Sequence, residues 1–132
     1  KGGIVLYRDC SVEITVRNFV EDETVIGVMN FLSVEFLAHS HIYYNMDKNV
    51  VSDEFFDKLS KELSYLIHEF PDTWNKSRYG NVFFDNIDEL NEFVETKETI
   101  STGAGFYEAL STRQRYRVDI VVEHMLKLIG VL

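Results

Sequence analysis

The chain has 132 residues, of which 45% are hydrophobic and 27% charged, a composition typical of a globular domain and not of a disordered or fibrous chain. Its 22 acidic and 13 basic residues give a net charge of −9, which disfavours direct binding to nucleic acid. No apolar run approaches the roughly 20 residues of a membrane span, and Cys10 is the only cysteine, so we expect a cytoplasmic protein without a disulfide or a thiolate zinc site.

The first 26 residues are predicted to form a β-hairpin. An apolar run covers residues 4–7, and apolar and polar side chains alternate over residues 12–17. This alternation is typical of a strand with one buried face. Because two strands are not stable alone, the hairpin is expected to pack on the helices that follow.

Residues 27–72 are predicted to form two helices joined by a short loop. Apolar side chains cover a wide face of residues 28–45, which indicates a central, largely buried helix. Ser52 is a good N-cap for the second helix, and Asp53 and Glu54 place negative charge in its first turn. Apolar side chains then recur every three or four residues until Pro71, where the helix is expected to end.

The remaining residues, 73–132, are predicted to contain one short strand and two helices. The strand is expected at residues 81–84. An acidic helix follows from Asp85 or Asn86 to residue 96, and the segment 85–98 holds six acids and one lysine, a net charge of 1 − 6 = −5. Its inward side chains are predicted to be Ile87, Leu90 and Val94. The last helix is expected over residues 111–129, with a buried stripe made by Val118, Val121, Val122, Met125 and Ile129. Together these elements predict one α+β domain over residues 1–132, mainly helical.

A candidate ligand site lies where the two helices of residues 27–72 meet. Asp53 and Asp57 are four residues apart and therefore share a helix face. Tyr43 and Tyr44 precede them across the loop. Carboxylates beside aromatic rings suit a flat cationic or polyhydroxylated ligand. The alternative is structural: the aspartates form a solvated first turn, and the tyrosines belong to the core with their hydroxyls in water.

The pattern Tyr-Tyr-x-Met-Asp-x-x-x-x-Ser-Asp-x-x-Phe-Asp-x-Leu-x-x-Glu-Leu, at residues 43–63, resembles the N-terminal helical subdomain of bacterial NAD⁺-dependent DNA ligases. The resemblance covers residues 38–72. It implies a ligase-like helix-turn-helix pair that binds the nicotinamide mononucleotide (NMN) half of NAD⁺. The side chains it assigns to the ligand are Tyr43, Tyr44, Asp53, Phe56 and Asp57.

Two of these five positions depart from the ligase pattern. Tyr44 stands where the ligases have histidine, so an imidazole is lost, and Phe56 stands where they have tyrosine, so a hydroxyl is lost. Each missing hydrogen bond is expected to cost the ligand about 1–3 kcal/mol.

Catalysis by this chain alone is not expected. It contains no Lys-x-Asp-Gly, the motif whose lysine becomes adenylylated in the ligases that this segment resembles. The resemblance therefore implies a non-catalytic module that requires no cofactor and takes NAD or NMN as its ligand. A subunit of a split ligase, acting beside a separate nucleotidyltransferase chain, is the related interpretation.

A second hypothesis treats the ligase-like helices as scaffold only. The acidic helix, through Asp85, Asp88, Glu89 and Glu92, would cover a basic nucleic-acid-binding surface of another protein. Small stand-alone relatives of enzyme subdomains resemble phage-encoded inhibitors of host defence, so this hypothesis describes an acidic inhibitor with a protein partner.

The remaining charged and metal-binding residue types give weaker predictions. Arg113, Arg115 and Arg117 are the only basic cluster. Arg113 and Arg117 share a helix face and could bind an anion or a partner, but we expect salt bridges with the acidic segment 85–98 instead. The four histidines do not have the spacing of a metal site; they are His39, His41, His68 and His124.

Overall fold

A computed structural model describes residues 22–101 and 104–132. Five α-helices account for most of this part of the chain, and no strand occurs among the described residues. In order they are α1 (Asp22–Ser40), α2 (Asp53–Glu69), α3 (Pro71–Lys76), α4 (Ile87–Glu95) and α5 (Thr112–Leu128). A π-helical turn, η1 (His41–Asn45), continues α1, and a 3₁₀ turn, η2 (Ala104–Phe106), precedes α5. The fold is therefore mainly helical, as predicted.

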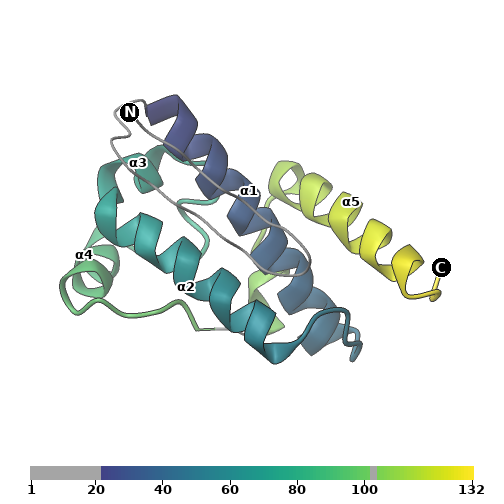
Figure 1. Ribbon diagram of the computed structural model, residues 1–132. Helices are drawn as coiled ribbons and strands as arrows, with labels where there is room; N and C mark the ends of the chain where they lie inside the picture. The colour runs from purple at the N-terminus through teal and green to yellow at the C-terminus, as the bar shows by residue number, and fades with distance from the viewer. Residues whose placement is uncertain (1–21, 102–103) are drawn as a thin grey trace.

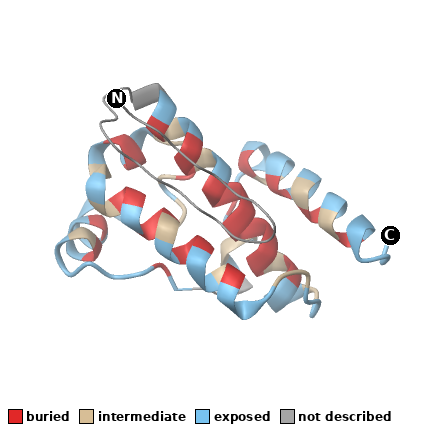
Figure 2. Ribbon diagram, in the orientation of Figure 1, coloured by how far each residue is buried: buried red, intermediate tan, exposed pale blue. Residues whose placement is uncertain are grey.

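Helix α1 lies at the centre of the fold and is contacted by α2, α3 and α5 (Figure 1). Its side chains are buried around most of its circumference over residues 32–40 (Figure 2), which confirms the central helix predicted for residues 28–45. Phe31 is an exception on the predicted apolar face, because it is 36% exposed. Among the largest fully buried side chains are Met29, Leu32, Phe36, Leu59, Leu63, Trp74 and Tyr79.

The segment Thr24–Asn45 is long and apolar enough to cross a membrane by length and composition. The expectation that no such segment exists is therefore wrong. However, 72% of its most apolar window is buried inside the protein, as expected for the core helix of a globular fold.

The predicted N-terminal hairpin is not supported where it can be compared with the structure. Residues 22–26 belong to α1 and are helical, because Val25 and Val28 join the apolar surface that α1 buries. Residues 1–21, which carry the rest of the prediction, lie outside the described residues.

The helix predicted to end at Pro71 ends at Glu69, so this boundary is confirmed. Pro71 is also the first residue of α3, a helix that was not predicted, and its fixed φ suits the first turn of a helix. The strand predicted at residues 81–84 is wrong. Residues 81–84 form turns and bends instead of a strand. Phe83 there stacks on Trp74 with ring centroids 5.9 Å apart, so its aromatic ring packs on the core without any ladder of backbone hydrogen bonds.

The starts of the other helices agree with the predicted caps. Ser52 Oγ accepts a hydrogen bond from the Phe55 N–H at 3.0 Å, and Asn86 Oδ1 accepts one from the Glu89 N–H at 3.0 Å. Ser111 begins α5 in a reciprocal capping box with Gln114.

The predicted inward faces of the last two long helices are correct only in part. On α4, Leu90 is buried and Val94 half-buried, but Ile87 is 52% exposed, and Phe93 takes the inward position. On α5, Val118 and Val122 are buried as predicted, whereas Ile129 lies beyond the helix and is exposed.

Candidate functional site

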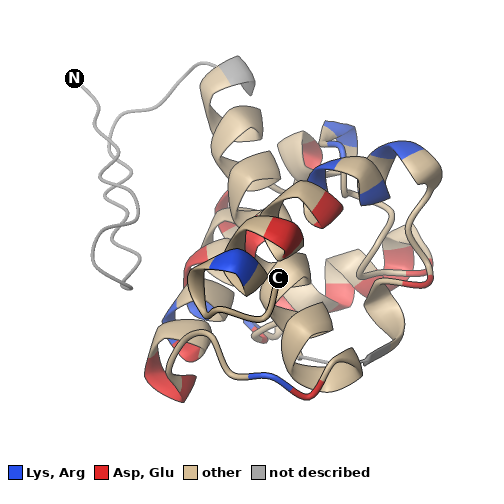
Figure 3. Ribbon diagram, turned by 90° about the vertical axis from the view of Figure 1, so that its right-hand side faces the viewer, with Lys and Arg blue, Asp and Glu red and all other residues tan. Residues whose placement is uncertain are grey.

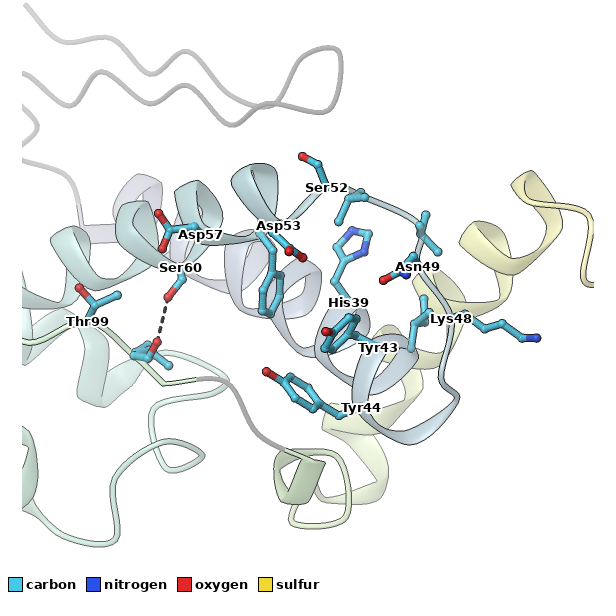
Figure 4. Close-up of a pocket in the computed structure, with 15 residues that line it drawn as sticks. His39, Tyr43, Tyr44, Lys48, Asn49, Ser52, Asp53, Asp57, Ser60 and Thr99 are labelled. Carbon is cyan, nitrogen blue, oxygen red and sulfur yellow. Dashed lines mark hydrogen bonds between the residues drawn. The ribbon is translucent and has the colours of Figure 1, made fainter.

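A cavity of about 320 Å³ lies between the end of α1 and the start of α2 (Figure 4). All five residues predicted to hold a ligand line it: Tyr43, Tyr44, Asp53, Phe56 and Asp57. We call this space the ligand cavity. Its volume is at the lower end of the roughly 300–1,000 Å³ typical of small-molecule sites.

The aromatic side of the ligand cavity is formed by the turn η1. Tyr43 and Tyr44 meet edge to face, with ring centroids 4.7 Å apart, and they are 48% and 44% exposed. The structural alternative required both tyrosines to be core residues, and their exposure shows that they are not. The loop that follows turns back through Asp47, which adopts a positive φ of 56° that aspartate tolerates better than most residues. Single π-helical turns of this kind are frequent at functional sites.

The acidic side comes from the first two turns of α2. Asp53 and Asp57 are both exposed, and Figure 4 shows Asp53 nearer to the tyrosine rings and Asp57 one turn further along α2. The Asp57 carboxylate lies 2.9 Å from the Lys61 ammonium, and both side chains are more than half exposed. Lys48 also lines the ligand cavity, but its side chain points away from the tyrosines. Asp53 is thus the carboxylate that enters the site without a cation partner among the described residues.

Phe56 forms part of the cavity lining while its ring stacks on a core residue. The centroids of the Phe56 and Phe36 rings lie 5.3 Å apart, with the ring planes only 10° from parallel. One face of Phe56 is therefore covered by Phe36. Because the stack fixes this ring, a ligand meets a rigid apolar surface at this point of the cavity.

The buried histidine of the ligand cavity was not predicted. His39 is 3% exposed and lies edge to face against Phe55. Its Nε2 lies 3.6 Å from Oε1 of the buried Glu35, and both atoms lack a hydrogen-bond partner among the described residues. Buried polar atoms without partners are uncommon and often occur at functional sites. The sequence signal was a histidine and a glutamate four residues apart on an otherwise apolar helix.

The far wall of the cavity consists of Thr99 and Ile100, neither of which was predicted to line it. Two serines of α2 hold this segment in place. Ser60 Oγ donates to the Ile100 carbonyl at 2.9 Å, and the Ile100 N–H donates to Ser64 Oγ at 2.9 Å. Both serines are buried, so these bonds replace water at the Ile100 backbone.

The acidic residues of the second hypothesis lie elsewhere, on and before α4. Their side chains are all exposed: Asp85, Asp88, Glu89 and Glu92. Glu89 and Glu92 border a second depression of about 400 Å³ whose lining includes Phe84 and Phe93. Thr99 and Ile100 line both this depression and the ligand cavity, whereas the four acidic residues do not line the ligand cavity.

The predicted salt bridges between the arginines of α5 and the acidic segment 85–98 are absent among the described residues. Arg115 instead lies over the Tyr107 ring, 4.8 Å from its centroid, and donates to the carbonyls of Tyr107, Glu108 and Leu110. Arg113 and Arg117 face a different part of the surface. No group of three or more potential metal ligands gathers within the described part of the chain.

Next to the ligand cavity, η1 is tied to the region before α5 by a stack of side chains. The His41 and Tyr107 rings lie 3.7 Å apart at their centroids, and the Tyr107 hydroxyl donates to Asp119 Oδ1. Burial lowers the pKa of His41, although Glu108 and Asp119 oppose that shift. Burial and the hydrogen bond to Asp119 raise the pKa of Tyr107 to about 12.

We expect Asp119→Asn to lower the pKa of Tyr107 from about 12 towards its ordinary value of 10.0. Because the folded-state pKa lies above the unfolded one, this tyrosine contributes stability that is complete below pH 10 and is lost as the pH rises towards 12. Tyrosinate absorbance, taken as the difference from a Tyr107→Phe variant, measures the titration. Glu123→Gln removes a carboxylate from the same helix and is the control, and it should leave the pKa of Tyr107 unchanged.

No protein-family model, curated protein or solved structure matches this chain. The likeness to the ligase subdomain therefore rests on the residues of the 43–63 pattern alone. The geometry of the cavity is independent of that likeness. Two exposed aromatic rings, a buried histidine and a carboxylate with no cation partner among the described residues surround one cavity.

Proposed function

We propose that this chain is a non-catalytic module that binds nicotinamide mononucleotide, free or as half of NAD. The supporting observation is that all five residues assigned to this ligand from the sequence pattern line one cavity, although they come from two helices. The proposal includes a subunit that presents the nucleotide to a separate nucleotidyltransferase chain.

The chemistry of the ligand cavity suits the nicotinamide end of these ligands. Oxidised nicotinamide attached to ribose is a planar ring that carries a positive charge. The faces of Tyr43 and Tyr44 attract such a cation, and the Asp53 carboxylate supplies the opposite charge. Ribose hydroxyls find hydrogen-bond acceptors in the carboxylates of Asp53 and Asp57.

Isothermal titration calorimetry with NMN and with NAD⁺ tests the proposal. We expect Asp53→Asn to weaken binding about tenfold, because a hydrogen bond or contact to a charged group contributes about 1.5 kcal/mol or more. Glu54→Gln is the matched control. Glu54 lies in the same first turn of α2 and is exposed, but it does not line the ligand cavity.

Both substitutions remove one negative charge from the start of α2, so their effects on helix stability should be similar. Affinity that falls equally in the two variants would show that only the general charge of the helix matters. Absence of measurable heat with millimolar NMN and NAD⁺ would overturn the proposal.

A second candidate function is supported by the exposed acids around α4. The pocket beside them combines carboxylates with phenylalanine rings, a surface suited to lysine or arginine side chains of a basic partner protein. Neutralising Asp85, Asp88, Glu89 and Glu92 together separates the candidates. NMN affinity is unaffected if the ligand cavity carries the function, whereas an inhibitor loses affinity for its basic partner, most strongly at low salt.

A further inference from the structure

Three arginines from two separate parts of the chain line one depression at the start of α5. Arg78 follows α3, and Arg113 and Arg117 lie one turn apart on α5. The depression has a volume of about 630 Å³, and Figure 3 shows basic positions gathering where α5 begins. We call it the arginine groove.

Three hydrogen bonds fix the two sides of the arginine groove against each other. Gln114 Nε2 donates to the Arg78 carbonyl at 2.7 Å, and the hydroxyl of the fully buried Tyr79 donates to the Gln114 carbonyl at 3.1 Å. The Arg78 N–H donates to Asn30 Oδ1 at 2.9 Å. The backbone that carries Arg78 is therefore held beside the first turn of α5.

The positive charge of the arginine groove is not neutralised within the described protein. Although the chain has 22 acidic residues, Arg78, Arg113 and Arg117 make no ion pair with any described residue. The N-terminal end of α5 adds positive potential of its own. Arg78 and Arg117 both oppose the rise in the pKa of Tyr79 that burial causes.

Such a site favours a compact anion over an extended one. The groove concentrates positive charge on a protein whose net charge is −9, so a long polyanion would extend from the groove over a surface that repels it. A phosphate monoester carries close to two negative charges in a small volume, and guanidinium groups pair with its oxygens in a bidentate manner. The hydroxyls of Ser111 and Thr112 line the same depression and supply further donors.

We propose that the arginine groove binds a phosphate monoester. Tyr116, which is 67% exposed, borders the groove and offers a ring face to a base. A nucleoside monophosphate and free phosphate present the same charged group to the arginines. They differ in whether Tyr116 contributes to the affinity.

Calorimetric titration of the full chain with inorganic phosphate and with adenosine monophosphate (AMP) tests this site. We expect both to bind, and the double variant Arg113→Gln, Arg117→Gln to weaken both at least tenfold. The control is Lys58→Gln, Lys61→Gln, which removes the same charge from the exposed surface of α2 and should leave both affinities unchanged. Thermal unfolding of each variant verifies that it is folded.

Tyr116→Ala distinguishes the sources of the phosphate. If the groove is a nucleotide site, the Tyr116→Ala variant loses affinity for AMP and keeps its affinity for inorganic phosphate. If it is a free-phosphate site, the wild type binds the two ligands with equal affinity. The proposal is overturned if the wild type binds neither ligand at millimolar concentration, or if the lysine control weakens binding as much as the arginine variant. Tighter binding of a single-stranded oligonucleotide than of AMP would also overturn it.

Discussion

Replacing Gln114 with leucine is expected to lower the free energy of unfolding by about 3 kcal/mol. Gln114 is a buried residue whose amide makes three hydrogen bonds: Nε2 donates to the Arg78 carbonyl and to Asn81 Oδ1, and Oε1 accepts from the Ser111 N–H. Leucine fills a similar volume and leaves all three partners without the amide. Chemical denaturation measures the loss, and thermal unfolding should show a midpoint lower by roughly 10 °C.

Two further variants make this expectation specific. Gln114→Glu keeps the acceptor for the Ser111 N–H but places a carboxylate oxygen against the Arg78 carbonyl and Asn81 Oδ1, so it should also be destabilising at neutral pH. Asn91→Ala removes an exposed amide of α4 and should change stability by less than about 0.5 kcal/mol. If Gln114→Leu were as stable as Asn91→Ala, the hydrogen bonds of the Gln114 amide to the turn after α3 would not contribute to the stability of the fold.

We expect Gly80→Ala to destabilise the protein by about 1–3 kcal/mol. A Cβ atom at this position would lie 2.4 Å from the Trp74 carbonyl oxygen and 3.2 Å from the Asn75 carbonyl oxygen. Both are backbone atoms, so no side-chain rotation relieves the contact. The turn after α3 must move away from the helix, and the packing of Trp74 is disturbed with it. Urea denaturation, compared with wild type at equal slope, measures the change.

Gly27→Ala is the matched substitution with the opposite expected sign. Gly27 lies within α1, and a Cβ atom there would meet no atom of the described residues within 4 Å. Alanine in a helix interior is more favourable than glycine by about 0.5–1 kcal/mol, so this variant should be more stable than wild type. Equal changes in the free energy of unfolding for the two substitutions would show that the turn at Gly80 does not pack closely against the backbone of α3.

The helices that the sequence predicted well are those with strong local signals. Ser52, Asn86 and Ser111 were each expected at or next to the first residue of a helix, and each caps its helix in the structure. Capping depends on residues within one turn, so it can be recognised without knowledge of the fold. The apolar repeat of α2 is equally local.

The elements that were predicted wrongly depend on distant parts of the chain. Helix α3 has six residues and a mostly polar sequence, and it is held by the burial of Trp74 against the core rather than by any periodic pattern. Phe83 and Phe84 have strong strand propensity, but the described structure offers them no strand to pair with, and their rings pack on Trp74 and Phe93 instead.

The candidate site divides in the same way. Tyr43, Tyr44, Asp53 and Asp57 could be grouped because a short loop connects their helices and brings the helix ends together. Ile100 lies forty positions after Ser60, and nothing in its own surroundings indicates that the two hydrogen-bond. The sequence therefore predicts one side of the ligand cavity but not the wall opposite.

Trp74 is the only tryptophan of the chain, and it is fully buried with its ring stacked on Phe83. It lines neither the ligand cavity nor the arginine groove. Its fluorescence emission should therefore shift to longer wavelength when the protein unfolds and stay unchanged when a ligand binds at either site. One intrinsic optical probe thus reports folding separately from binding, in unlabelled protein and in the same titration.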